Sequence, residues 1–214
     1  MQIFIDTAEI PEIERYACFI DGVTTNPTLL ARLGKSSPME DIIGKIAKII
    51  PGPISVEVIS ENCQGMVTEA QQLAKMSPNI VIKIPMTEEG LKASIILKKL
   101  KIKTNVTLIF SANQALLAAK AGATYASVFV GRLDDQGADG MQVVKDSLEI
   151  FKNYSFDTRL IAASIRNPIH VVNAARAGCH IATIPPAIIN LMMKHKLTDI
   201  GLEQFLNDWK KTQQ

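Results

Sequence analysis

The fold is decided by a strand–helix–strand unit at residues 80–108, which reads IVIKIPMTEEGLKASIILKKLKIKTNVTL. Residues 80–84 and 103–108 are short runs rich in apolar and β-branched side chains. Residues 88–100, between them, have the composition and period of a helix. Strands joined by a helical crossover run parallel, and a parallel sheet is normally covered by helices. This unit therefore predicts an α/β protein.

The same alternation continues along the whole chain. Further strands are predicted at 2–6, 22–26, 54–58, 125–130, 159–164 and 180–184. Further helices are predicted at 9–18, 39–49, 64–77, 111–121, 140–153, 168–178 and 186–194. Eight such units favour a closed (β/α)₈ TIM barrel, as a single domain over residues 1–214. A doubly wound open sheet is the competing arrangement, but no GxGxxG or GxxxxGK[ST] turn follows the first strand.

An extra amphipathic helix is expected at about 199–211, after the eighth unit. Its apolar stripe consists of Leu202, Phe205, Leu206 and Trp209, and Thr198-Asp199 is a candidate N-cap. This helix either closes its own barrel or packs on a neighbouring subunit.

Composition excludes several classes of protein. The 23 basic and 21 acidic residues are scattered, and no basic run is interleaved with aromatics, so nucleic-acid binding is not expected. No apolar stretch reaches the ~18 residues of a membrane span. The strand predicted at 2–6 follows Met1 directly, without the basic and long apolar regions of a signal peptide. The three cysteines are far apart and have no CxxC spacing. We therefore expect a cytoplasmic protein with reduced thiols.

Lys83 is the most informative residue, because it lies inside an apolar strand where its ammonium group loses hydration. A desolvated amine can attack a carbonyl and form a Schiff base, although neighbouring carboxylates favour the charged ammonium. The alternative is a purely structural buried ion pair with Glu57.

Other polar residues lie toward the C-terminal ends of the predicted strands: Asp6, Thr24, Asn26, Glu57, Asn105, Thr107, Ser127 and Ser164. Period-two alternation directs them to the barrel axis, so they should converge at the C-terminal mouth, where barrel enzymes have their sites. Carboxylates there can move protons, and amides and hydroxyls can bind a polyhydroxylated substrate. Arg132 and Arg166, near Ser164, suit a phosphate group.

Several other interpretations remain open. Asp6 could cap the first helix, and Arg132 could pair only with Asp134 or Asp135. Asp6 and Glu57 could hold Mg²⁺ in a metal-dependent enzyme, or the protein could bind a sugar phosphate without turnover. No metal-ligand spacing is present in the remaining candidates, which we interpret as ordinary histidines: His170, His180 and His195.

Two long motifs resemble the signatures of the transaldolase family: residues 21–28 (DGVTTNPT) and 82–91 (IKIPMTEEGL). Shorter matches are residues 104–108 (TNVTL), 129–135 (FVGRLDD) and 163–168 (ASIRNP). The resemblance extends from residue 2 to about Trp209 and is to the small, short-chain branch.

This resemblance implies a (β/α)₈ enzyme without cofactor or metal. Such an enzyme moves a dihydroxyacetone unit from sedoheptulose 7-phosphate or fructose 6-phosphate to glyceraldehyde 3-phosphate or erythrose 4-phosphate, in the pentose phosphate pathway. The Schiff-base lysine matches Lys83, the C–C cleavage base Asp6, and the acid/base glutamate Glu57, with a water held by Thr107. The implied substrate-binding residues are Asn26, Asn105, Ser127, Phe129, Arg132, Ser164 and Arg166. The small branch also implies a homo-oligomer, a decamer or pentamer, in which the last helix reaches a neighbour.

The sister fructose-6-phosphate aldolases are similar but have Gln and Tyr where this chain has Glu57 and Phe129. These two positions favour the transferase over an aldolase that releases free dihydroxyacetone. Val128 replaces a proline that is frequent in the family.

Overall fold

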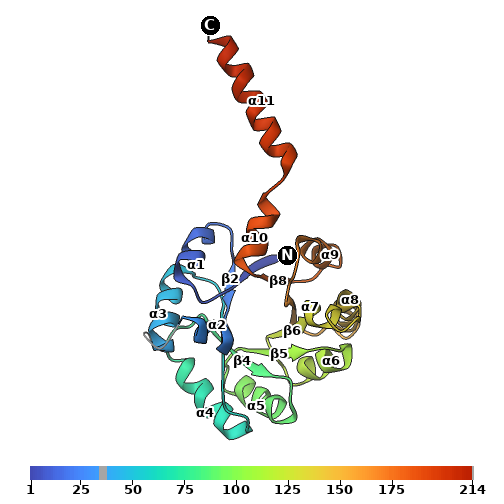
Figure 1. Ribbon diagram of the computed structural model, residues 1–214. Coiled ribbons are helices and arrows are strands. Elements are labelled where there is room, and N and C mark those ends of the chain that lie inside the picture. The colour runs from blue at the N-terminus through green and yellow to red at the C-terminus, as the bar shows by residue number, and fades with distance from the viewer. Residues whose placement is uncertain (34–37, 214) are drawn as a thin grey trace.

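The strands of the molecule close into a barrel, as the computed structural model of residues 1–33 and 38–213 shows. Each strand is parallel to the next, and β8 pairs with β1 to complete the ring. Figure 1 shows the helices arranged around the outside of this ring. The predicted (β/α)₈ barrel is therefore confirmed, and the alternative interpretation, an open doubly wound sheet, is wrong.

The eight strands begin and end within two residues of the predicted limits. They are β1 (Gln2–Asp6), β2 (Gly22–Thr24), β3 (Ile54–Glu57), β4 (Ile80–Pro85), β5 (Thr104–Ile109), β6 (Tyr125–Phe129), β7 (Arg159–Ala163) and β8 (Ile181–Ile184). The largest difference is at β2, which ends at Thr24 because Asn26 already caps a helix.

Every predicted helix is present. These helices are α1 (Ile10–Tyr16), α3 (Met39–Ile49), α4 (Cys63–Leu73), α5 (Glu88–Lys99), α6 (Ala112–Lys120), α8 (Gly140–Asn153), α9 (Pro168–Arg176), α10 (Pro186–Met193) and α11 (Lys196–Thr212). Two short helices were not predicted, α2 (Pro27–Arg32) and α7 (Val130–Asp134), and each follows the C-terminal end of a strand. Arg132 lies in α7.

The apolar core has two parts, as strand alternation requires. The larger part lies between the strands and the surrounding helices. The smaller part fills the interior of the barrel, and its members are Phe4, Val81, Tyr125, Ile161 and Ile181. Asp6, Lys83, Ser127 and Thr183 each follow one of these residues by two positions and so lie on the same side of the strand. The barrel interior thus changes from apolar to polar toward the C-terminal ends of the strands.

Helix α11 extends away from the barrel, as Figure 1 shows. It begins at Lys196, and its cap is the side chain of His195 instead of the predicted Thr198-Asp199. None of its residues is buried, and Phe205 and Trp209 are 71% and 64% exposed. The interpretation that this helix closes its own barrel is therefore wrong. Over residues 1–33 and 38–213, no helix combines the length and the apolar character that crossing a membrane requires.

Candidate active site

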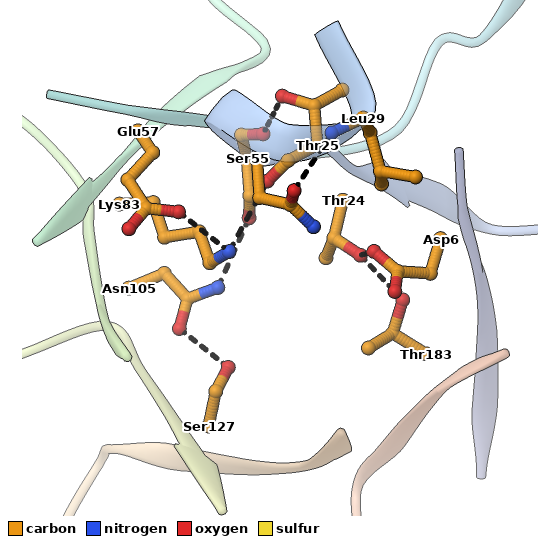
Figure 2. Close-up of polar contacts among 11 residues, drawn as sticks. Asp6, Thr24, Thr25, Leu29, Ser55, Glu57, Lys83, Asn105, Ser127 and Thr183 are labelled. Carbon is orange, nitrogen blue, oxygen red and sulfur yellow. Dashed lines mark hydrogen bonds and ion pairs between the residues drawn. The ribbon is translucent and has the colours of Figure 1, made fainter. Parts of the chain in front are cut away.

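Lys83 lies inside the barrel near the C-terminal end of β4, and its side chain is 7% exposed. Its Nζ lies 2.9 Å from Oε2 of Glu57 and 3.2 Å from the backbone carbonyl oxygen of Thr25, to which it donates (Figure 2). The strand register explains the ion pair, because Glu57 on β3 lies directly opposite Lys83 on β4. The amine is thus held at a defined position by two acceptors, one on β3 and one directly after the end of β2.

Asp6 belongs to a second hydrogen-bonded group on the other side of the barrel interior (Figure 2). The hydroxyl of Thr24 donates to Oδ1 of Asp6 at 2.8 Å and lies 2.6 Å from the hydroxyl of Thr183. Since the Thr24 proton is used on Asp6, Thr183 must donate to Thr24. Asp6 makes no helix cap: α1 begins after Glu9, and no side chain caps it. The alternative that Asp6 is a capping residue is therefore wrong.

Burial raises the pKa of the Asp6 carboxyl above its ordinary value of 3.8. The charge of Lys83 and the hydrogen bond from Thr24 oppose this effect, and the charge of Glu57 adds to it. Because the raising effects are larger, Asp6 takes up a proton at a higher pH than an exposed aspartate. A carboxylate with such a pKa is suited to accept a proton and return it.

A cavity of about 540 Å³ opens above these two groups at the C-terminal ends of the strands. Its lining includes nearly all of the predicted site residues: Asp6, Asn26, Glu57, Lys83, Thr107, Ser127, Phe129, Arg132, Ser164 and Arg166. The positions of these residues agree with the expected convergence at the mouth of the barrel.

Asn105 is the predicted site residue that does not line the cavity. It is fully buried, and it donates to Oγ of Ser55 at 3.1 Å and accepts from the hydroxyl of Ser127 at 2.8 Å (Figure 2). The structure therefore places Asn105 beneath the floor of the cavity, where it orients Ser127.

Thr107 occupies an irregular point of the sheet. Between β5 and β6, Val106 pairs with Ala126 and Ile109 pairs with Val128, so two residues of β5 lie opposite one residue of β6. Leu108 has a φ of 60°, in the left-handed region that non-glycine residues rarely adopt. Such a bulge changes the direction of a side chain and is frequent beside active sites. The hydroxyl of Thr107 is buried and has no hydrogen-bond partner within the described part of the chain, so it is available to a water or a substrate.

Arginine side chains line the mouth of the cavity. The guanidinium of Arg132 lies 5.1 Å from the ring centre of Phe129, and that ring contacts Phe110 edge to face. Among the described residues, Asp135 forms an ion pair with Arg166 at 3.0 Å, and Arg132 has no ion pair. The alternative that Arg132 pairs with Asp134 or Asp135 is therefore wrong.

Arg32 and Thr183 are site residues that were not predicted. Arg32 reaches the cavity from α2, and Thr183 lines it from β8. The side chain of Asn26 caps α2 by accepting from the backbone N–H of Leu29, and Pro27 is its first residue. An asparagine followed by proline is a helix-start signal that could have located Arg32. Thr183 gave only the weak signal of a lone hydroxyl in an apolar strand.

All three histidines have local structural contacts. Those of His170 are with Asp134 and the backbone of Arg166, His180 accepts from Leu160, and His195 caps α11. Within residues 1–33 and 38–213, no group of three or more His, Cys, Asp and Glu side chains is arranged to hold a metal ion.

Comparison with known proteins gives a consistent result. A family model described as transaldolase/fructose-6-phosphate aldolase matches residues 3–214. A probable transaldolase from Caldicellulosiruptor saccharolyticus is 58% identical over 214 residues, which cover 99% of this chain and 98% of that protein. A probable transaldolase from Thermoanaerobacter is 55% identical over 213 residues, with the same coverage. Among solved structures, a mandelate oxidase variant with an FMN adduct has a TM-score of 0.60 at 10% identity. It is matched over 86% of this chain and 64% of its own, and this likeness concerns the fold alone.

Proposed function

The chain belongs to the transaldolase/fructose-6-phosphate aldolase family, and we propose that it is a transaldolase that acts through a Schiff base on Lys83. The proposed donor is sedoheptulose 7-phosphate or fructose 6-phosphate. The proposed acceptor is glyceraldehyde 3-phosphate or erythrose 4-phosphate, as in the pentose phosphate pathway. The observation that carries this proposal is the buried Lys83 amine, which faces a cavity between the two carboxylates of Glu57 and Asp6.

The first step forms the imine. The Lys83 ammonium gives a proton to Glu57, which is 2.9 Å away, and the free amine attacks C2 of the ketose. The attacking nitrogen then loses one of its two protons to the former carbonyl oxygen, which becomes the hydroxyl of a neutral carbinolamine. Glu57 then returns its proton to this hydroxyl through a water on Thr107, and the hydroxyl leaves as water. The product is a protonated imine, and Glu57 is again a carboxylate.

The second step breaks the C3–C4 bond. Asp6 takes the proton of the C4 hydroxyl, and the aldose leaves as an aldehyde. The electron pair of the broken bond forms a C2–C3 double bond and neutralises the imine nitrogen. The enamine then attacks the carbonyl carbon of the acceptor, and Asp6 returns its proton to the new hydroxyl. Hydrolysis by the reverse of the first step releases the new ketose.

The substrate phosphate is assigned to the arginine side of the mouth. Arg132, Ser164 and Arg166 line the same cavity as Lys83 and can donate to phosphate oxygens. Arg32 is a further cation at the mouth and adds positive charge from the α2 side. Asn26 and Ser127 are the candidate partners for substrate hydroxyls, whereas Asn105 acts through Ser127.

Borohydride reduction in the presence of fructose 6-phosphate tests the Schiff base. If an imine forms, the reduced adduct adds mass to the peptide that contains Lys83. An unmodified Lys83 peptide, together with activity that EDTA abolishes, would instead favour the metal-dependent alternative with Asp6 and Glu57 as ligands. Binding without turnover or adduct would favour a sugar-phosphate binding protein.

The second candidate function is a fructose-6-phosphate aldolase, which the family description also includes. Product analysis with fructose 6-phosphate, with and without erythrose 4-phosphate, separates the two. A seven-carbon ketose only in the presence of the acceptor indicates transfer, and free dihydroxyacetone from fructose 6-phosphate alone indicates the aldolase. Phe129 favours transfer, because its ring has no hydroxyl that could protonate the enamine.

We also propose that the protein is a homo-oligomer in which α11 packs on a neighbouring copy. The support is the exposed apolar face of this helix, none of whose residues is buried, because the helix extends away from its own barrel. A cytoplasmic location is likewise a proposal, supported by three cysteines that are all free thiols.

A further inference from the structure

The proposed phosphate site is assembled from two separate segments. Arg132 lies in α7, directly after β6, whereas Ser164 and Arg166 lie between β7 and α9. A phosphate that contacts all three residues needs these segments at a fixed separation. The residues that join α7 to the segment after β7 therefore determine the shape of the site.

His170, on α9, contacts both segments. Its Nε2 lies 3.0 Å from Oδ2 of Asp134 in α7, and its Nδ1 accepts the backbone N–H of Arg166 at 3.4 Å. The contact at Nδ1 is a hydrogen bond from the Arg166 backbone, and the contact at Nε2 pairs the ring with the Asp134 carboxylate. The other carboxylate oxygen of Asp134 accepts the backbone N–H of Gly140 at 3.0 Å, so this carboxylate is itself held in place.

The remaining links between the segments are of two kinds. Gly131 in α7 donates its N–H to the carbonyl oxygen of Ser164 at 3.0 Å, which fixes one point of contact. The ion pair between Arg166 and Asp135 is more than half exposed on both sides, and such pairs contribute little. The His170 side chain is only 13% exposed, so its contacts are better shielded from water.

We propose that His170 is a positioning residue that sets the distance between Arg132 and the Ser164–Arg166 segment and thereby gives the enzyme its affinity for phosphorylated ketoses. His170 does not line the cavity and acts through Asp134 and the Arg166 backbone. This inference rests on the proposed function. It separates the recognition of the phosphate from the chemistry at Lys83.

Borohydride trapping with two ketones tests the inference. Fructose 6-phosphate uses the phosphate site, whereas dihydroxyacetone has no phosphate and needs only the surroundings of Lys83. For His170→Ala, we expect the half-saturating concentration of fructose 6-phosphate to rise about tenfold, because both the hydrogen bond from Arg166 and the contact with Asp134 are lost. The half-saturating concentration of dihydroxyacetone should change by less than about twofold, since none of those bonds reaches Lys83.

Two further variants, each of which keeps one of the two contacts, test the inference if His170→Ala does not fold. His170→Asn keeps an acceptor near the Nδ1 position, and His170→Gln keeps a donor near the Nε2 position. Each should raise the half-saturating concentration of fructose 6-phosphate by about threefold, because each loses one contact. Arg176→Gln is the matched control, because Arg176 lies in the same groove as His170 and has no contact with Arg166 or Asp134 among the described hydrogen bonds and ion pairs.

Failure of the inference about His170 and failure of the proposed function give different results. Equal shifts for both ketones would show a general structural role and overturn the inference, and so would an unchanged affinity for fructose 6-phosphate. An absence of any adduct in the unmodified protein, with either ketone, would refute the proposed function and this inference with it.

Discussion

At the scale of single residues, the pair of Lys83 and Glu57 is either part of the catalytic machinery or a purely structural ion pair. The two roles predict different results for substitutions of these residues. We expect Lys83→Met to lower turnover by about a thousandfold or more, because no imine can form. The same change leaves Glu57 without a partner and should lower the free energy of unfolding by about 3 kcal/mol. Steady-state turnover and urea denaturation measure the two effects separately.

The double variant Lys83→Met/Glu57→Gln is the control for the ion pair. It removes the unpaired charge, so it should regain much of the lost stability and none of the activity. If the pair is only structural, the double variant should be stable and active, and the catalytic role of Lys83 would be rejected.

The raised pKa of Asp6 predicts the pH dependence of the reaction. Asp6 must be ionised to act as a base, so kcat/KM should fall with decreasing pH as the carboxyl becomes protonated. Because the Thr24 hydrogen bond lowers this pKa, Thr24→Val should move the acidic limb of the kcat/KM profile to higher pH. Thr158→Val is a matched control, since the buried Thr158 hydroxyl donates to the carbonyl of Ala123, away from the site. A limb that stays in place with Thr24→Val would exclude Asp6 as the titrating base.

The Asp6 carboxyl affects activity and stability in opposite directions: lower pH decreases kcat/KM, but it increases the contribution of this group to the stability of the fold. Between its ordinary value of 3.8 and its raised pKa, Asp6 is protonated in the folded protein and ionised in the unfolded chain. The folded state then binds more protons, so this group increases stability as the pH falls through that window. Asp6→Asn cannot titrate, and its stability relative to the unmodified protein should be highest at neutral pH and decline toward pH 4. Denaturant midpoints at several pH values measure this difference, and a constant difference would contradict it.

Side-chain alternation places most of the site residues, but it does not give their depth in the barrel. Asn105 and Thr107 lie on the same side of β5, so both were expected in the cavity. Asn105 is in register with Lys83 and lies two residues before Thr107; at this level of the barrel the Lys83 side chain lines the cavity and the Asn105 side chain does not. Lys83 is long enough and Asn105 is too short. The layer of a residue depends on the stagger of the closed barrel, which no local pattern encodes.

At the scale of elements, the helices that were missed are those too short to show a period. Helices α2 and α7 have six and five residues, less than two turns. They carry Arg32 and Arg132, so their positions matter more for the site than their lengths suggest. Longer helices such as α3 and α8 were predicted with their observed bounds, because three or more turns present a continuous apolar face.

The close contact between α7 and the segment after β7 gives a prediction at Gly131. A Cβ at this position would lie 2.1 Å from the carbonyl oxygen of Ser164 and 2.5 Å from Cγ of Arg166. Gly131→Ala must therefore push the two segments apart. We expect a loss of about 2 kcal/mol in the free energy of unfolding, typical of overpacking, and a higher KM for phosphorylated substrates.

Gly44→Ala is the matched control for this substitution. Gly44 lies within α3, and a Cβ there meets no atom within 4 Å. This change should stabilise the protein by about 0.5–1 kcal/mol through helix propensity. Thermal or urea unfolding compares the two variants. Gly131→Ala with unchanged stability and KM would show that the segments can separate freely and would weaken the case for a rigid phosphate site.

At the scale of the whole molecule, the closed barrel follows from repeated local units, whereas the direction of α11 does not. Each strand–helix unit buries an apolar face against its neighbours, so eight units determine one compact arrangement. Helix α11 has an apolar stripe of the same kind, and its sequence alone allowed two partners. The structure excludes its own barrel, since the helix extends away and none of its residues is buried.

The proposed oligomer gives the last prediction. If α11 packs on a neighbouring copy, Phe205→Glu/Trp209→Glu should dissociate the assembly, because two buried aromatic contacts would be replaced by charges. Light scattering after size-exclusion chromatography should show a smaller mass, and circular dichroism should show an intact barrel, because α11 contributes no buried residue to it. Tyr154→Glu is the matched control: Tyr154 is as exposed as Phe205, at 71%, and lies at the end of α8 instead of on α11. An unchanged mass for the double variant, or a single-copy mass for the unmodified protein, would reject α11 as the site of association.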